Sequence, residues 1–375
     1  MQVYLDNSAT TKTFSVVNEK MIEMMTENYG NPSSLHRMGM NAEDKISFAR
    51  GVLSSYLKCN EKNIYFTSGG TEANNLAILG YVLRNPRKGK RVITTVAEHA
   101  SVSEPFKYLE TQGYDVKYVK CKENGKLDYD ELSSLIDDNT SFVSVMQVNN
   151  ETGEIFDIKK IKDIISSKNK NTVLHSDCVQ SFMKIPLEKD EILTFSSLII
   201  NGPKGVGAIY IKDGLLMKPI IYGGGQEKGL RNGTENAVGI YGFGIALSEH
   251  IKNDKSKYIK SLKLRLLNGL KDMDKININT DIENSAPHIL NISFTGIRSE
   301  IILHTLEQFG IYVSSGSACS NNGVKEKVLE KMGFSKQLAD SAIRFSLSGD
   351  NTKDEIDYAI ETVKREIEIL RKRLK

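Results

Sequence analysis

Short apolar, β-branched runs alternate with amphipathic segments over the first two thirds of the chain. "NIYFT" (63–67) precedes a segment of helical periodicity that begins near Thr71, and "RVITTV" (91–96) precedes another that begins near Ser101. Further runs with strand character are "DVKYVKC", "TSFVSVMQV", "TVLHSD" and "ILTFSSLII". Alternating strands and helices predict an α/β fold with a mainly parallel sheet, and runs that are apolar on both faces are typical of its buried strands.

The pattern changes near Asn253. "KYIKSLKLRLLNGLKDM" predicts a long amphipathic helix, which is followed by the short strands "HILNISF" and "IYVSSG" and by a charged helix that ends in "KREIEILRKRLK". We therefore predict a large domain over residues 12–255 and a smaller α+β domain over residues 256–375, to which residues 1–11 also belong.

Composition narrows the class of protein. A chain of 375 residues with 39% hydrophobic and 26% charged residues is typical of a soluble globular protein. The 50 basic and 47 acidic residues nearly balance, so no nucleic-acid or membrane surface is expected. "MQVYLDNSATT" has no signal-peptide pattern, and Cys59, Cys121, Cys178 and Cys319 show no paired metal-ligand spacing. We therefore expect a cytoplasmic protein without a metal site.

Polar residues that follow the strands are candidates for a ligand site, because open α/β sheets bind ligands at the carboxyl ends of their strands. "SGGTEANN" (68–75) indicates either an anion site at a helix N-terminus or an ordinary capped turn. His99 could stack on a planar cofactor or move a proton, although a lone histidine is more often structural. Asn149 to Gly153 form a dense polar segment that either satisfies itself in a turn or holds a ligand.

A buried carboxylate is expected at Asp177, which ends "TVLHSD" and lies near Gln180. It requires a cationic partner, either a protonated ring nitrogen or an Arg or Lys. Cys319 lies among small polar residues in "SSGSACSNNG", as exposed reactive thiols do, and Thr234 lies in the glycine-rich "YGGGQEKGLRNGTEN". Arg344 suits a bidentate carboxylate or a surface ion pair. Together these features predict a site for a planar phosphorylated cofactor, a carboxylate substrate and a nucleophilic thiol.

From "YLDNSATT" to "AIRFSLS" the sequence resembles the cysteine desulfurases of the NifS/IscS type, which are class-V aminotransferases and fold-type I pyridoxal-phosphate (PLP) enzymes. The resemblance implies a large domain with a mainly parallel seven-stranded sheet and a smaller C-terminal domain that carries the cysteine loop. It also implies PLP as cofactor, L-cysteine as substrate and a homodimer. The products of the family are alanine and protein-bound sulfur, which passes to an acceptor or iron–sulfur scaffold protein, or to thiolated tRNA.

The resemblance assigns the phosphate end of the cofactor to four residues. Gly70 and Thr71 look like part of the phosphate cup, Ser196 resembles a phosphate ligand, and Thr234 looks like the phosphate contact donated by the other subunit. His99 looks like the residue that stacks on the pyridine ring and assists proton transfer.

The remaining roles concern the ring, the substrate and the thiol. Asp177 looks like the partner of the ring nitrogen, and Gln180 like a contact of the ring hydroxyl. Asn150 resembles the residue that touches both the ring hydroxyl and the substrate. Arg344 looks like the clamp for the substrate carboxylate, and Cys319 like the nucleophile that accepts sulfur as a persulfide.

The stretch "TFSSLIINGPKG" (194–205) departs from the family pattern Ser-x-His-Lys-x-x-Gly-Pro-Lys-Gly. With "GPKG" aligned at 202–205, Leu198 occupies the His position and Ile199 the position of the Schiff-base lysine, while Lys204 matches the second lysine of the pattern. Isoleucine cannot ionise. Loss of a general acid or base costs roughly 10²–10⁴-fold in rate, and the loss of covalent activation adds to that cost.

Three interpretations remain open. The first is a desulfurase homologue that holds PLP non-covalently, if it binds PLP, with slow or absent turnover and His99 as substitute base. The second is a non-catalytic scaffold or a persulfide carrier that uses Cys319. The third is different chemistry in the same cleft, which is disfavoured because an aliphatic residue in place of the lysine stem conserves packing. We also expect Asp177 to be unpaired in the absence of a ligand, which favours retained cofactor binding.

Overall fold

The computed structural model describes residues 1–122, 125–316 and 327–373, and its largest element is a seven-stranded sheet with the strand order β2-β8-β7-β6-β5-β3-β4. The strands are β2 (Ile64–Thr67), β3 (Arg91–Thr95), β4 (Asp115–Val119), β5 (Thr140–Ser144), β6 (Val173–Asp177), β7 (Ile192–Ser196) and β8 (Gly207–Ile211). Strand β8 runs antiparallel to both β2 and β7, and the other neighbours are parallel. The predicted α/β fold with a mainly parallel sheet is therefore confirmed.

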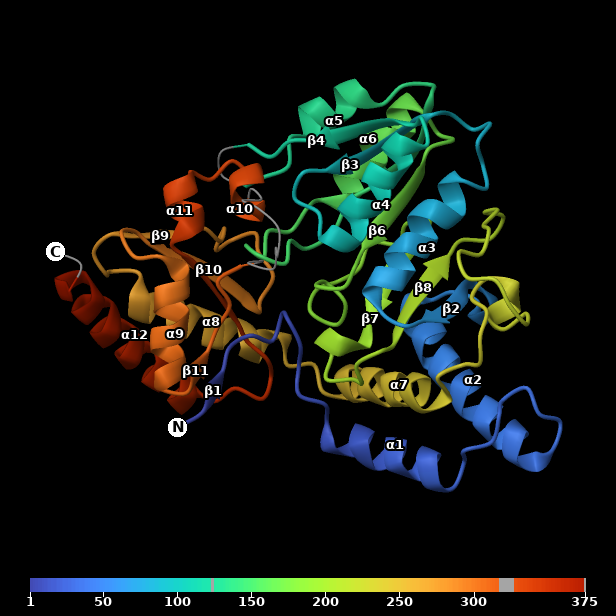
Figure 1. Cartoon of the computed structure of the whole chain (residues 1–375), viewed down its shortest axis with the longest axis horizontal. Coiled ribbons are helices and arrows are strands. Elements are labelled where there is room, and N and C mark those ends of the chain that lie inside the picture. The colour runs from blue at the N-terminus through green and yellow to red at the C-terminus, as the bar shows by residue number, and fades with distance from the viewer. Residues whose placement is uncertain (123–124, 317–326, 374–375) are drawn as a thin grey trace.

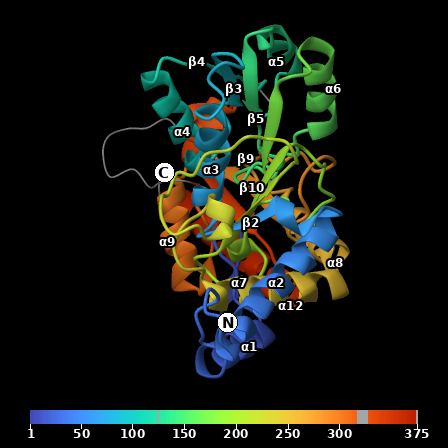
Figure 2. The ribbon, with the colours of Figure 1, turned by 90° about the vertical axis from the view of Figure 1, so that its right-hand side faces the viewer.

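Helices cover both faces of this sheet, because most of its strands bury apolar side chains on both sides. Leu193 and Phe195 of β7 pack with α1, α2 and α7, whereas Ile192 packs with α3 and α4. Figure 2 shows α4 and α6 on opposite sides of β3 and β5. The helices are α1 (Ser15–Thr26), α2 (Arg37–Leu57), α3 (Gly70–Val82), α4 (Ala100–Thr111), α5 (Tyr129–Leu135), α6 (Ile158–Lys168) and α7 (Ala237–Lys252).

A second region packs around its own core, on the left of Figure 1. Strands β9 (Ile276–Ile278) and β12 (Ala342–Ser346) flank β10 (Ile289–Phe294) in an antiparallel sheet, and β1 (Val3–Tyr4) pairs in parallel with β11 (Ile311–Tyr312). The helices are α8 (Ser256–Leu270), α9 (Ser299–Gln308), α10 (Val328–Lys331), α11 (Lys336–Asp340) and α12 (Lys353–Arg373).

The division into two domains stays a prediction, which this core supports. Val3 and Leu5 share one apolar cluster with residues of α8, α9 and α12. The chain leaves α7 at Lys252 and enters α8 at Ser256, close to the expected boundary. No helix within the described residues is long and apolar enough to cross a membrane.

The end of "ILTFSSLII" differs from the expected strand. Strand β7 ends at Ser196, and residues Ser197–Ile199 form a 3₁₀ turn. The hydroxyl of Ser197 donates to the carbonyls of Pro203 and Val206, which bends the chain away from the sheet. The prediction of a continuous strand through Leu198 and Ile199 was therefore wrong.

Candidate cofactor and substrate site

A cavity of about 590 Å³ lies at the carboxyl ends of β6 and β7, where residues of the second region also reach the large sheet. Eight of the predicted site residues line it: Gly70, Thr71, His99, Asn150, Asp177, Gln180, Ser196 and Arg344. Thr234 is exposed and does not line this cavity, and Cys319 lies outside the described residues. The structure therefore brings these eight together, while their individual roles stay predictions.

One end of the cavity is the N-terminus of α3. Gly69 precedes this helix with a φ of 151°, a conformation that favours glycine, and no side chain caps the first turn. The first backbone hydrogen bond of the helix runs from the Ala73 N–H to the Gly69 carbonyl. The N–H groups of Gly70 and Thr71 make no hydrogen bond with other described residues, and Ser196 lies beside Gly70. This end can hold an anion.

Asp177 ends β6 deep in the cavity and is 6% exposed. Its Oδ2 accepts a hydrogen bond from Asn74 Nδ2 (2.8 Å), and its Oδ1 accepts one from the Val179 N–H (2.9 Å). Helix α3 thus supplies an amide hydrogen bond to Asp177, but an amide carries no charge that could compensate a carboxylate. No Lys or Arg of the described residues forms an ion pair with it, and burial raises the pKa of its carboxyl.

His99 is the N-cap of α4 and joins the same network. Its Nδ1 accepts the Ser101 N–H (3.1 Å) and lies 2.8 Å from the Ser101 hydroxyl, which in turn accepts from Asn74 (2.9 Å). Because Nδ1 is an acceptor here, the neutral imidazole carries its proton on Nε2. In this state the ring nitrogen that could remove a proton from a substrate is already occupied by a hydrogen bond.

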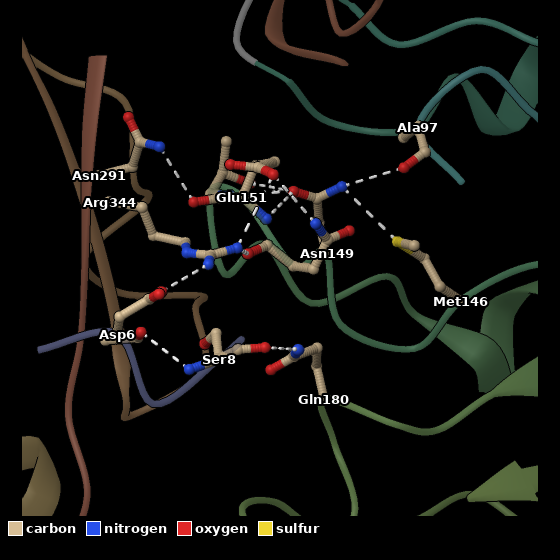
Figure 3. Close-up of polar contacts among 12 residues, drawn as sticks. Asp6, Ser8, Ala97, Met146, Asn149, Glu151, Gln180, Asn291 and Arg344 are labelled. Carbon is tan, nitrogen blue, oxygen red and sulfur yellow. Dashed lines mark hydrogen bonds and ion pairs between the residues drawn. The ribbon is translucent and has the colours of Figure 1, made fainter. Parts of the chain in front are cut away.

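Arg344 of β12 also lines the cavity and is 6% exposed. Figure 3 shows its guanidinium between Asp6 and Glu151. Its Nη2 lies 2.9 Å from Asp6 Oδ1, and its Nη1 donates to the Asn150 carbonyl (2.9 Å) and lies 3.7 Å from Glu151 Oε1. The guanidinium is thus already compensated by two carboxylates. A substrate carboxylate has to share this guanidinium with Asp6 or replace it.

Two amide side chains also line the cavity. Gln180 Nε2 donates to the Ser8 carbonyl (3.0 Å), as Figure 3 shows, and its Oε1 lies 3.2 Å from His288 Nε2. Asn150 Nδ2 donates to Glu151 Oε1 (3.1 Å), whereas Asn150 Oδ1 is buried without a hydrogen-bond partner. This acceptor is therefore available to a hydrogen-bond donor of a ligand.

The remaining wall at β7 is apolar. Leu198 and Ile199 line the cavity, and Ile199 is 1% exposed. No lysine is among the described residues that line it. The described lining of the cavity therefore offers no lysine amine.

Several cavity residues were missed by sequence reasoning. The N-terminal segment contributes Asp6 and Ser8, although "YLDNSATT" was noticed only as a family motif. Glu151 was seen in a polar segment without a role. His288, which contacts Gln180 but does not line the cavity, gave no signal because the two residues are 108 positions apart. Ser314 to Gly316 also line the cavity, just before the segment that contains Cys319.

Comparisons with known proteins agree with this geometry. The family model described as Aminotransferase class-V matches residues 3–359. A cysteine desulfurase IscS from Buchnera aphidicola subsp. Baizongia pistaciae is 41% identical over 381 residues, covering 98% of this chain and 93% of that protein. A cysteine desulfurase IscS from Clostridium botulinum (strain Hall) is 38% identical over 372 residues, covering 96% of this chain and 93% of that protein.

Solved structures agree as well. A NifS-like protein superposes with a TM-score of 0.93 at 36% identity over 98% of this chain and 100% of that chain. The structure of SspA in complex with cysteine gives a TM-score of 0.81 at 28% identity, over 92% of this chain and 99% of that chain. Cysteine desulfurases depend on PLP, and cysteine is their substrate. This chain belongs to the class-V aminotransferase family, among relatives that are cysteine desulfurases of the IscS/NifS type.

Proposed function

We propose that this protein is a cysteine desulfurase homologue that binds PLP without a covalent link and turns over L-cysteine slowly. The observation that carries the proposal is the lining of one cavity. It contains the N-terminus of α3, the buried Asp177 and the Arg344 guanidinium, yet its wall bears Ile199 and no lysine of the described residues. The alignment of "GPKG" at 202–205 with the family pattern supports position 199 as that of the cofactor lysine.

The residues present fit a phosphorylated pyridine cofactor. The free N–H groups of Gly70 and Thr71, together with the Ser196 hydroxyl, would hold the phosphate. Asp177 is a buried carboxyl without a cation, so a protonated ring nitrogen would supply the missing charge. The orphaned Asn150 Oδ1 would accept a hydrogen bond from the ring hydroxyl or the substrate.

When bound, PLP supplies an electron-accepting ring that makes the Cα hydrogen of an attached amino acid more acidic. Arg344 would bind the carboxylate of cysteine as it exchanges Asp6 for the substrate. His99 would then move a proton at Cα. Because its Nδ1 already accepts the Ser101 N–H, the ring has to break this hydrogen bond before Nδ1 can act as a base. This requirement supports slow turnover.

An absorbance titration with PLP, followed by borohydride reduction and mass spectrometry, tests the binding mode. We expect saturable binding that dialysis reverses and an unchanged protein mass after reduction. A reduced PLP adduct on any lysine of the intact protein would overturn the non-covalent mode. Alanine formation from L-cysteine tests turnover, and a rate no higher than that of free PLP would overturn the enzymatic part.

A persulfide carrier is the alternative function. It is supported by Ser314 to Gly316, which line the cavity and lead directly into the segment with Cys319. Incubation with a low-molecular-weight persulfide and no PLP should add one sulfur atom to Cys319, with Cys319→Ser as the matched control. An unmodified Cys319 in intact-mass and peptide analysis would exclude the carrier.

We further propose a homodimer in which the partner subunit donates Thr234 to the phosphate. Thr234 is exposed and lies away from the cavity of its own chain, which supports a role in another one. Light scattering after gel filtration measures the mass. A monomer at the concentrations used for PLP titration would contradict this assembly.

A further inference from the structure

A second cavity, of about 470 Å³, lies at the junction of α1, α7 and α8. Figure 1 shows α1 and α7 below the large sheet and α8 to their left, in the second region. Asn201 lines this cavity, and Ile199, two residues earlier, lines the cofactor cavity. One short segment therefore contacts both cavities. No residue lines both cavities within the part of the chain that the structure describes.

Lys184 is the central polar residue of this second cavity. It is 5% exposed, yet no ion pair or hydrogen bond of its ammonium with another described residue is present. Burial lowers the pKa of Lys184 to about 8, and the negative charge of Asp350 acts in the opposite direction. At neutral pH the side chain therefore still carries most of its charge. A buried charge without a partner is costly, and an anion in the cavity would remove that cost.

The N-terminus of α1 provides a second, independent set of donors. Ser15 and Val16 line the cavity, and their N–H groups make no hydrogen bond with other described residues. The N-cap Phe14 offers no side-chain acceptor, and the first turn contains no acidic residue. The positive end of a 12-residue helix is thus open towards the same space as Lys184.

Each of the other charged groups of the cavity has an ion-pair or hydrogen-bond partner. Glu249 pairs with Lys252 (3.0 Å), Lys255 donates to the Gly349 carbonyl (3.1 Å), and Asp350 accepts from Asn201 (3.4 Å). The N–H of Ser256, the first residue of α8, donates to Asp254 Oδ1 (2.8 Å). Glu249, Lys255 and Asp350 line the same cavity as Lys184. Lys252 and Asp254 are neighbours of lining residues in the sequence.

His250 is held as well, because its Nε2 lies 3.1 Å from the Ile200 carbonyl and burial lowers its pKa to about 4. It is therefore neutral and neither attracts nor repels a charge. Phe14, Val16, Met183 and Ile259 give the cavity an apolar wall. A ligand with an oxyanion and a small apolar body matches these surfaces.

We propose that this second cavity binds a small organic anion, whose carboxylate or phosphate group lies between the Lys184 ammonium and the N-terminal turn of α1. The site is separate from the cofactor cavity and does not depend on PLP. Carboxylate and phosphate monoester ligands share the required chemistry, so the experiment compares them directly.

Calorimetric titration of the full-length protein with propionate, with methyl phosphate and with inorganic phosphate tests the site. We expect saturable binding of at least one of the two organic anions, weaker binding of inorganic phosphate, and no change when PLP is present. The preferred organic anion identifies the head group. Absence of saturable binding for both organic anions would overturn the proposal, as would inorganic phosphate binding most tightly.

Two variants locate the bound anion. Lys184→Met keeps the apolar stem and removes the charge, so it should abolish binding while folding is retained; Lys168→Met, at the exposed end of α6, is the matched control. Ser15→Pro removes one N–H at the first helical position, where proline is tolerated, and should weaken binding about 10-fold. Unchanged affinity in either variant, with thermal unfolding showing a folded protein, would place the anion elsewhere.

Discussion

Ile199→Lys is the most informative substitution, because it returns an amine to the wall of the cofactor cavity. Ile199 is 1% exposed and lies in the 3₁₀ turn after β7, so its side chain has one direction in which to grow, into the cavity that it lines. That cavity also contains the carboxylates of Asp177 and Glu151, which can compensate an ammonium. We therefore expect the variant to fold.

The magnitudes follow from burial and from the role of the amine. Full burial of an isoleucine side chain is worth about 1.5–3 kcal/mol. A lysine stem retains part of that contact, so we expect the free energy of unfolding to fall by about 1–2 kcal/mol without PLP. A restored general acid–base group should raise the rate of alanine formation by roughly 10²–10⁴-fold.

The assay measures alanine from L-cysteine at saturating PLP, together with borohydride trapping and intact mass. Ile199→Met is the control, since methionine is flexible and apolar but cannot form an imine. We expect trapped PLP and faster turnover only in Ile199→Lys. If that variant binds PLP as tightly as the parent chain yet shows neither a trapped adduct nor a higher rate, position 199 does not face the reactive carbon, and the explanation of slow turnover is wrong.

Three further predictions concern buried charges. Asp177→Asn should weaken PLP binding by roughly 10–100-fold, because a charge-assisted hydrogen bond is worth about 1.5–3 kcal/mol; equal affinity in an absorbance titration would contradict the role of this carboxyl. Arg344→Ala leaves Asp6 and Glu151 without their cation and should lower the free energy of unfolding by about 3 kcal/mol. Urea denaturation measures this loss, which should be smaller in the control variant Arg344→Lys. Burial raises the pKa of Glu98 to about 8 from 4.5, so the folded state binds a proton that the unfolded state releases, and stability falls as pH rises between these values. Glu98→Gln should therefore gain stability relative to the parent chain from pH 5 to pH 8, and a pH-independent difference would refute this linkage.

Local patterns predicted the elements that local sequence controls. The apolar runs of β3, β6 and β7 and the starts of α3 and α4 follow from side-chain periodicity and from glycine or histidine at the helix entrance. The antiparallel insertion of β8 between β2 and β7 could not be predicted in this way, because strand order depends on pairing between distant segments. The 3₁₀ turn at Leu198 was missed because it depends on hydrogen bonds from Ser197 to Pro203 and Val206.

In the candidate site as well, features set by local sequence could be predicted, whereas contacts between distant segments could not. Eight of its residues were recognised because they follow strands or match a family motif, yet their partners were not. Asn74 satisfies Asp177 across 103 residues, and Asp6 compensates Arg344 across 338 residues. Neither contact leaves a local signal. Sequence patterns therefore identified the groups that face a ligand better than the groups that hold them in place.

The N-terminal segment determines when the site can form during synthesis. The Val3 and Leu5 N–H groups bond to the carbonyls of Gly310 and Tyr312, and the Leu5 carbonyl accepts the Ser346 N–H. These residues therefore pair only with segments that follow far later in the sequence, and closure of so long a loop is slow. The large sheet, whose strands end at Ile211, can fold earlier. The substrate end of the cavity is therefore the last part to assemble, and a nascent chain should bind the cofactor phosphate before it can bind an amino acid.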